Sequence, residues 1–84
     1  MKADEIKPRL REFILKDLMR NPTYPLADDE AMITGGLVDS FDMAQIAVFA
    51  EREFNIYLPD SDLTVEAMDT LDRMAEHIAQ RGSV

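Results

Sequence analysis

The residue of this sequence best placed to do chemistry is Ser40, which lies in the stretch GGLVDSFD at residues 35–42. An apolar run of helical spacing starts directly after it, so the hydroxyl is expected in the first turn of a helix. Unpaired backbone N–H groups and the helix dipole stabilise a phosphate at such a position. Ser40 is therefore either a plain helix-start residue or the attachment point of a phosphate-linked group, and the local pattern alone favours the first.

A hydrolase function for Ser40 is not expected. The G-x-S-x-G nucleophile elbow needs glycine two residues to either side of the serine, whereas Val38 precedes it here. The only histidine, His77, is predicted near the far end of another helix, as a surface residue or a cation at the helix C-terminus. The chain has no cysteine, which excludes disulfides and thiolate metal sites. These features argue against a hydrolase triad.

A calcium site is also not expected. The stretch DSDLTVEAMDTL begins with Asp60 and Asp62 at the first and third positions of an EF-hand loop. Such a loop needs glycine at position six and a bidentate glutamate at position twelve, and these are Val65 and Leu71. The two aspartates are better interpreted as solvated loop and capping residues, and no metal is predicted.

Charge and length limit the partners that the chain can have. Seventeen acidic and nine basic residues give a net charge of -8 over 84 residues, which disfavours nucleic acid. This charge favours docking on basic protein surfaces, or it merely keeps the protein soluble. No apolar run approaches the ~20 residues of a membrane span, and the N-terminus lacks a signal peptide. We expect a cytoplasmic monomer with no membrane span.

Hydrophobic periodicity predicts one all-α domain over residues 1–84, a small four-helix bundle with three main helices and one short one. The predicted helices cover about 4–20, 39–54, 64–68 and 70–81, and a long loop covers 21–38. Pro8 fits best in the first turn of its helix, and Thr64 can cap the short one. Apolar residues are expected to pin the long loop across the bundle, namely Tyr24, Leu26, Met32, Ile33, Leu37 and Val38.

The second predicted helix has two apolar faces. Asp39 can cap it, with Asp42 as the reciprocal half of a capping box, which leaves the Ser40 hydroxyl free. The core face consists of Met43, Ile46, Ala47, Ala50 and Phe54. The opposite face carries a docking strip, defined as Phe41, Gln45, Val48 and Arg52, with Phe49 at its flank and Asp39, Asp42 and Glu51 at its rim. The alternative is that the long loop covers these apolar residues.

The whole pattern resembles the acyl carrier protein family. GGLVDSFD is similar to the family's G-x-D-S-[L/F/M] phosphopantetheine attachment signature. MAQIAVFAEREFNIYLPDSDL is similar to the family's second helix and its exit, and LTVEAMDTLDRMAEHI to the last helices of stand-alone carriers. The resemblance covers about residues 4–81, with these landmarks in register.

The resemblance implies that Ser40, next to the motif residue Asp39, is esterified to 4'-phosphopantetheine taken from coenzyme A. The thiol of that arm would carry acyl groups as thioesters in lipid or secondary-metabolite biosynthesis. Implied partners are a phosphopantetheinyl transferase, an acyl-loading enzyme and downstream acyl-processing enzymes, which read the second helix. An aminoacyl or peptidyl carrier with the same Ser40 chemistry is an alternative, and so is an unmodified acidic adaptor.

Three residues depart from the family pattern and favour a specialised stand-alone carrier. Phe41 follows the serine where leucine is usual, and Gln45 and Arg52 stand where acids are common. Charges at the rim of an interface mainly set steering and the rejection of wrong partners, so these changes are expected to alter partner choice. The small core residues Ala47 and Ala50 leave open whether an acyl chain enters the bundle or side chains fill it.

Overall fold

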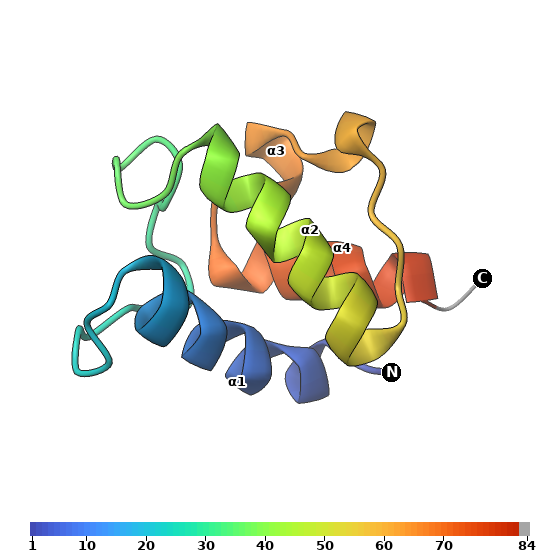
Figure 1. Cartoon of the computed structure of the whole chain (residues 1–84), viewed down its shortest axis with the longest axis horizontal. Coiled ribbons are helices and arrows are strands. Elements are labelled where there is room, and N and C mark those ends of the chain that lie inside the picture. Colours follow the sequence, from blue (N-terminus) through green and yellow to red (C-terminus); the bar gives the residue numbers. More distant parts are fainter. Residues whose placement is uncertain (83–84) are drawn as a thin grey trace.

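Four α-helices and two single-turn helical segments form the regular structure of residues 1–82, the part of the chain that the computed structural model describes. In chain order they are α1 (Ala3–Phe13), the π-helix η1 (Ile14–Leu18), α2 (Ser40–Phe54), the 3-10 turn η2 (Asp60–Asp62), α3 (Val65–Met68) and α4 (Leu71–Gly82). No strand occurs within residues 1–82, so the predicted all-α class is confirmed (Figure 1).

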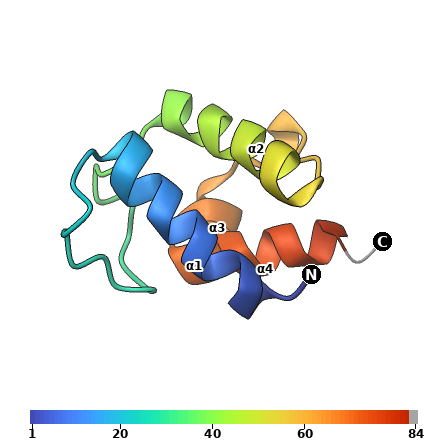
Figure 2. The same ribbon diagram turned by 60° about the horizontal axis from the view of Figure 1, so that its bottom comes forward.

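The helices enclose one apolar core. α1 lies against α4, and α2 lies across the pair, as the turned view shows (Figure 2). Each α-helix contributes fully buried side chains. The main ones are Ile6 and Leu10 from α1, Ile14 from η1, with which α1 forms the first helical segment, Ile46 and Ala50 from α2, Met68 from α3, and Leu71, Met74 and Ile78 from α4. The start of α1 and the end of α4 lie at one end of the molecule, and the segment 19–39 lies at the other (Figure 1).

The first helical segment differs in detail from the predicted helix over 4–20. α1 begins at Ala3, so Pro8 falls in its second turn and not in the first turn as predicted. The helical segment ends at Leu18, after a π-helical turn, and Arg20 has a left-handed φ of 55°. The Asn21-Pro22 pair follows, and a proline disfavours the α conformation for the residue before it. The chain therefore leaves the helix here and enters the long connection.

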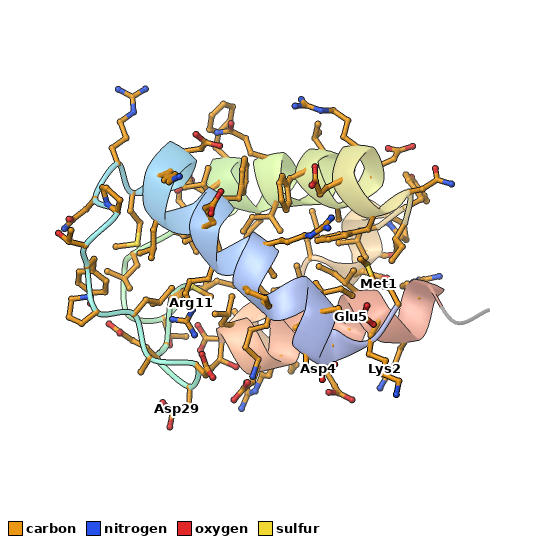
Figure 3. All side chains as sticks on the ribbon, turned by 90° about the horizontal axis from the view of Figure 1, so that it is seen from below. Met1, Lys2, Asp4, Glu5, Arg11 and Asp29 are labelled. Carbon is orange, nitrogen blue, oxygen red and sulfur yellow. The ribbon has the colours of Figure 1, made fainter. Side chains whose placement is uncertain are left out.

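The connection over residues 19–39 contains turns and no helix, and it is held against the helices. Leu26, Met32 and Val38 are buried in the core. The Arg11 guanidinium donates to the Leu26 carbonyl and the Asp28 carboxylate, and Figure 3 shows Arg11 directed from α1 toward this connection. These contacts fix the path of the chain that leads into α2.

Gly35 and Gly36 are adjacent in this connection, and we expect alanine to destabilise the fold by different amounts at the two positions. A Cβ at Gly35 would lie far inside van der Waals contact of the Ala31 carbonyl oxygen, and backbone cannot swing aside as a side chain can. Gly35→Ala is therefore expected to lower the free energy of unfolding by about 2 kcal/mol in urea denaturation. Gly36 has open space but a φ of +81°, so Gly36→Ala is expected to cost about 1 kcal/mol. Equal stability of Gly35→Ala and the wild type would contradict this close approach.

Candidate functional site

Ser40 is the first residue of α2, and its hydroxyl is not used to start the helix. Asp39 is the N-cap, and its carboxylate accepts a hydrogen bond of 2.9 Å from the backbone N–H of Asp42. The Asp42 carboxylate accepts one of 3.1 Å from the Asp39 N–H, which confirms the predicted capping box. Ser40 is exposed, and its hydroxyl makes no hydrogen bond to any of residues 1–82. It is therefore available for reaction at the start of a helix.

The chain before Ser40 is fixed by Asp69, which lies between α3 and α4. The Asp69 carboxylate is buried and accepts hydrogen bonds from the Ile33 N–H (2.8 Å), the Thr34 N–H (3.0 Å) and the Thr34 hydroxyl (2.8 Å). Its own carbonyl accepts another from the Met32 N–H at 2.7 Å. These bonds, with the Thr34 N–H contributing most, hold the pKa of Asp69 below its usual value although burial opposes them.

Sequence reasoning gave Asp69 no role beyond starting the last helix. In the structure the Thr70 hydroxyl accepts the hydrogen bond from the Arg73 N–H at the start of α4, at 3.1 Å. The Asp69 side chain is therefore free to reach a segment about 35 residues earlier in the chain. No local pattern could have indicated this contact, because an aspartate followed by a threonine at a helix start is equally consistent with either residue as the cap.

An apolar pocket of about 370 Å³ opens beside Ser40. Its apolar lining comes from three segments, the connection before α2, α2 itself and the region around α3, and consists of Ile33, Met43, Ala44, Leu63 and Val65. Ser40 and Asp60 supply its polar groups. The pocket can accept an alkyl or amide-linked chain that starts at the Ser40 hydroxyl, and sequence reasoning did not foresee it.

An ionic cluster anchors the turn η2, which carries Asp60 to the edge of this pocket. Arg81 of α4 donates to both Asp62 oxygens, at 2.5 and 2.8 Å, and His77 Nε2 lies 2.9 Å from Asp62 Oδ2. The Asp62 side chain is only 11% exposed, so the prediction of a solvated loop residue was wrong. His77 is half-buried in this contact and is not a free surface residue. The hydrogen bonds from Arg81 and then His77 lower the pKa of Asp62 to about 2.

This lowered pKa predicts how the stability depends on pH. The pKa of Asp62 is lower in the folded chain than in the unfolded chain. Its ionised form therefore stabilises the fold at pH values above its ordinary pKa of 3.8. That contribution is lost as the pH falls from 3.8 to about 2. We expect Asp62→Asn to melt below the wild type at neutral pH and to approach it near pH 2, as followed by circular dichroism. A difference in Tm that is independent of pH would contradict this assignment, and Asp60→Asn serves as the control.

The docking strip lies on the outer face of α2. Phe41 is 70% exposed and Val48 is 54% exposed, so the long connection does not cover them. Gln45, Glu51 and Arg52 are also exposed, whereas Asp42 is half-buried. The flanking residue Phe49 is half-buried and stacks on Phe13 of α1, with ring centroids 4.3 Å apart.

The core face of α2 is narrower than predicted. Met43, Ile46 and Ala50 are buried, and Ala47 and Phe54 are half-buried at the edges of that face. The rings of Phe54 and Phe49 are nearly perpendicular, with centroids 5.6 Å apart, so Phe54 belongs partly to the aromatic cluster that α2 forms with α1.

Within residues 1–82, no group of three or more histidine, aspartate or glutamate side chains is placed to hold a metal ion. None of the helices in that range is both long enough and apolar enough to cross a membrane. Comparison with models of known protein families and with curated proteins found no match.

Proposed function

We propose that this chain is a carrier protein that holds acyl groups as thioesters on a 4'-phosphopantetheine arm attached to Ser40. The observation that carries the proposal is the state of the Ser40 hydroxyl, which is exposed and without a hydrogen-bond partner in residues 1–82. Asp39 caps the helix in its place. The resemblance of residues 4–81 to the acyl carrier protein family supports the same assignment, including a carrier-type four-helix bundle with a long loop after the first helix.

The residues around Ser40 fit such a group. The arm would supply the terminal thiol that this cysteine-free chain lacks. The start of α2 would stabilise the negative charge of a phosphate on the Ser40 hydroxyl, through the helix dipole and backbone N–H groups without a helical partner. The carboxylates of Asp39 and Asp42 each accept a hydrogen bond from a backbone N–H in the capping box. The pocket between Ile33, Met43 and Val65 offers apolar surface to the part of the arm nearest the serine.

A phosphopantetheinyl transferase, an acyl-loading enzyme and downstream acyl-processing enzymes would contact α2 around Ser40, with Asp42 and Glu51 as acidic contacts and the docking strip as the apolar one. The chain would act as a cytoplasmic monomer in lipid or secondary-metabolite biosynthesis and would not itself catalyse a reaction. An aminoacyl or peptidyl carrier would use Ser40 in the same way and would differ in the enzyme that loads it.

Measurement of the intact mass tests the proposal. The purified chain is incubated with coenzyme A and a broad-specificity phosphopantetheinyl transferase, and a gain of one phosphopantetheine group is expected. No gain with several transferases that modify a known carrier in the same buffer would contradict the proposal. That result would favour the unmodified acidic adaptor.

A further inference from the structure

Residues 59–67 form a strap that contains η2 and most of α3, and it is drawn in yellow to orange between α2 and α4 in Figure 1. Leu58 and Met68, which flank the strap, are both buried in the core. Between these two anchors, no residue of η2 is buried. The backbone N–H groups of residues 62–64 donate to carbonyls of residues 59–62, and within residues 1–82 no backbone hydrogen bond ties η2 to another element.

The middle of the strap is tied to α4 by one side chain, that of Asp62. Its carboxylate accepts two hydrogen bonds from Arg81, at 2.5 and 2.8 Å, and lies 2.9 Å from His77 Nε2. His77 and Arg81 are four residues apart on α4, so both reach the same carboxylate. No other side chain of the strap makes a hydrogen bond or ion pair to a different element within residues 1–82. We call these three residues the latch.

The strap also forms one wall of the pocket of about 370 Å³ beside Ser40. Leu63 and Val65 line this pocket together with Met43 and Ala44 of α2. Leu63 is half-buried and Val65 is 41% exposed, so an open hollow, and not close packing, separates the strap from α2 here. Segments with few buried apolar contacts open at a lower free energy than the core. Movement of the strap away from α2 therefore exposes little additional apolar surface.

The latch is partly open to water on its α4 side. The side chains of Arg81 and His77 are 45% and 26% exposed, so both remain hydrated when their bonds to Asp62 break. The Asp62 carboxylate would reach water as the strap moves outward. No charge is then left buried without a partner, which is the main cost of breaking a buried ion pair.

We infer that the strap is a lid over the pocket beside Ser40 and that the latch holds this lid closed. When the latch opens, residues 59–67 move away from α2 and the pocket widens, while the core between α1, α2 and α4 stays folded. A group attached to Ser40 would gain room in the pocket only while the lid is open. The inference goes beyond the proposed function, because the lid and its latch are present whether or not Ser40 is modified.

Native-state hydrogen exchange of the unmodified full chain, followed by NMR, tests this inference. The strap amides of Leu63 and Thr64 are expected to exchange faster than those of the core residues Leu10 and Ile78. Their exchange is also expected to depend less on added urea, because opening of the lid exposes less surface than global unfolding does. This pattern would show that the strap opens while the core is folded.

Two matched variants separate the latch from general stability. Arg81→Gln removes the paired hydrogen bonds to Asp62 and is expected to speed exchange of the strap amides about tenfold. Lys7→Gln also removes a cation from an ion pair, that of Lys7 Nζ with Asp72 of α4 at 2.5 Å. Because this pair joins α1 to α4 and persists when the lid opens, Lys7→Gln is expected to leave the strap amides unchanged.

A single cysteine reports the opening of the pocket directly. The chain has no cysteine of its own, so the only thiol of Met43→Cys lies at a buried position that lines the pocket. Its alkylation by iodoacetamide is expected to become about tenfold faster when Arg81→Gln is added. Addition of Lys7→Gln is expected to leave the alkylation rate unchanged.

Exchange of the strap and core amides at one rate and with one urea dependence would overturn the inference, because the strap would then open only with the whole chain. Equal effects of Arg81→Gln and Lys7→Gln on the strap amides would also overturn it, as would alkylation of Met43→Cys that Arg81→Gln leaves unchanged. If Met43→Cys does not fold, the exchange measurements decide alone, since they need no cysteine. None of these measurements involves modification of Ser40, so their outcome is separate from that of the mass measurement.

Discussion

The Ser40→Ala variant is expected to keep its unmodified mass under conditions in which the wild-type chain gains one phosphopantetheine group. The substitution removes the only atom of residue 40 that can form the phosphate ester, so the loss should be complete. It should leave the fold intact, because Asp39 and Asp42 form the capping box without the serine side chain. Alanine is also the better helix former. Intact mass and the thermal unfolding curve of the same sample provide both measurements.

Ser61 supplies the matched control for this prediction. It is also an exposed serine beside an aspartate, but it lies in the short turn η2 and not at the start of a long helix. Ser61→Ala is expected to be modified like the wild type. Modification of Ser40→Ala would show that Ser40 is not the attachment point. If Ser61→Ala then failed to be modified, Ser61 would be the attachment point instead.

The Asp69→Ala variant is expected to unfold at a temperature roughly 10 °C below that of the wild type. The Asp69 carboxylate satisfies two backbone N–H groups and one hydroxyl of residues 33 and 34, and alanine would leave all three without their partner. Removing one partner of such bonds costs more than the bonds themselves contribute, because the remaining donors are only partly accessible to water. The connection into α2 is expected to loosen as well, which hydrogen exchange at Ile33 and Thr34 would detect.

Asp69→Asn separates the hydrogen bonds from the charge. Its amide oxygen can still accept from the two N–H groups, so we expect it to lose less than half as much in Tm as Asp69→Ala. The pKa of Asp69 is lowered in the folded chain. The stabilisation by its charge is therefore present at pH values above the pKa of 3.8 in the unfolded chain, and it is lost as the pH falls below that value. The Tm of Asp69→Asn should therefore approach that of the wild type in acid. Equal Tm values of Asp69→Ala and the wild type at neutral pH would contradict the assigned role.

The position of Ser40 depends on contacts from distant parts of the chain. Asp69 holds the connection before α2, and the capping box holds the first turn of α2. Arg81 and His77 hold η2 through Asp62, and η2 closes the edge of the pocket next to the serine. A substitution in α4 can therefore alter the surroundings of Ser40 without touching it.

The sequence by itself determined those features that depend on near neighbours. Hydrophobic periodicity predicted the helices, because a helix repeats every 3.6 residues whatever it packs against. The capping box was predictable because Asp39 and Asp42 are three residues apart. The exposure of Phe41 and Val48 followed from their place opposite the core face of α2. Ser40 became the candidate attachment site through the resemblance of residues 4–81 to the acyl carrier protein family, because the local pattern alone favours a plain helix-start residue.

Only the tertiary structure decided which distant residues meet. Asp69 binds residues 33 and 34, Asp62 binds His77 and Arg81, and Phe13 stacks on Phe49, each across a gap of at least fifteen residues. Periodicity defines the apolar face of each helix but not the helix that it meets or the rotation between them. The pocket beside Ser40 exists because of that packing, so its shape could not be predicted from the sequence.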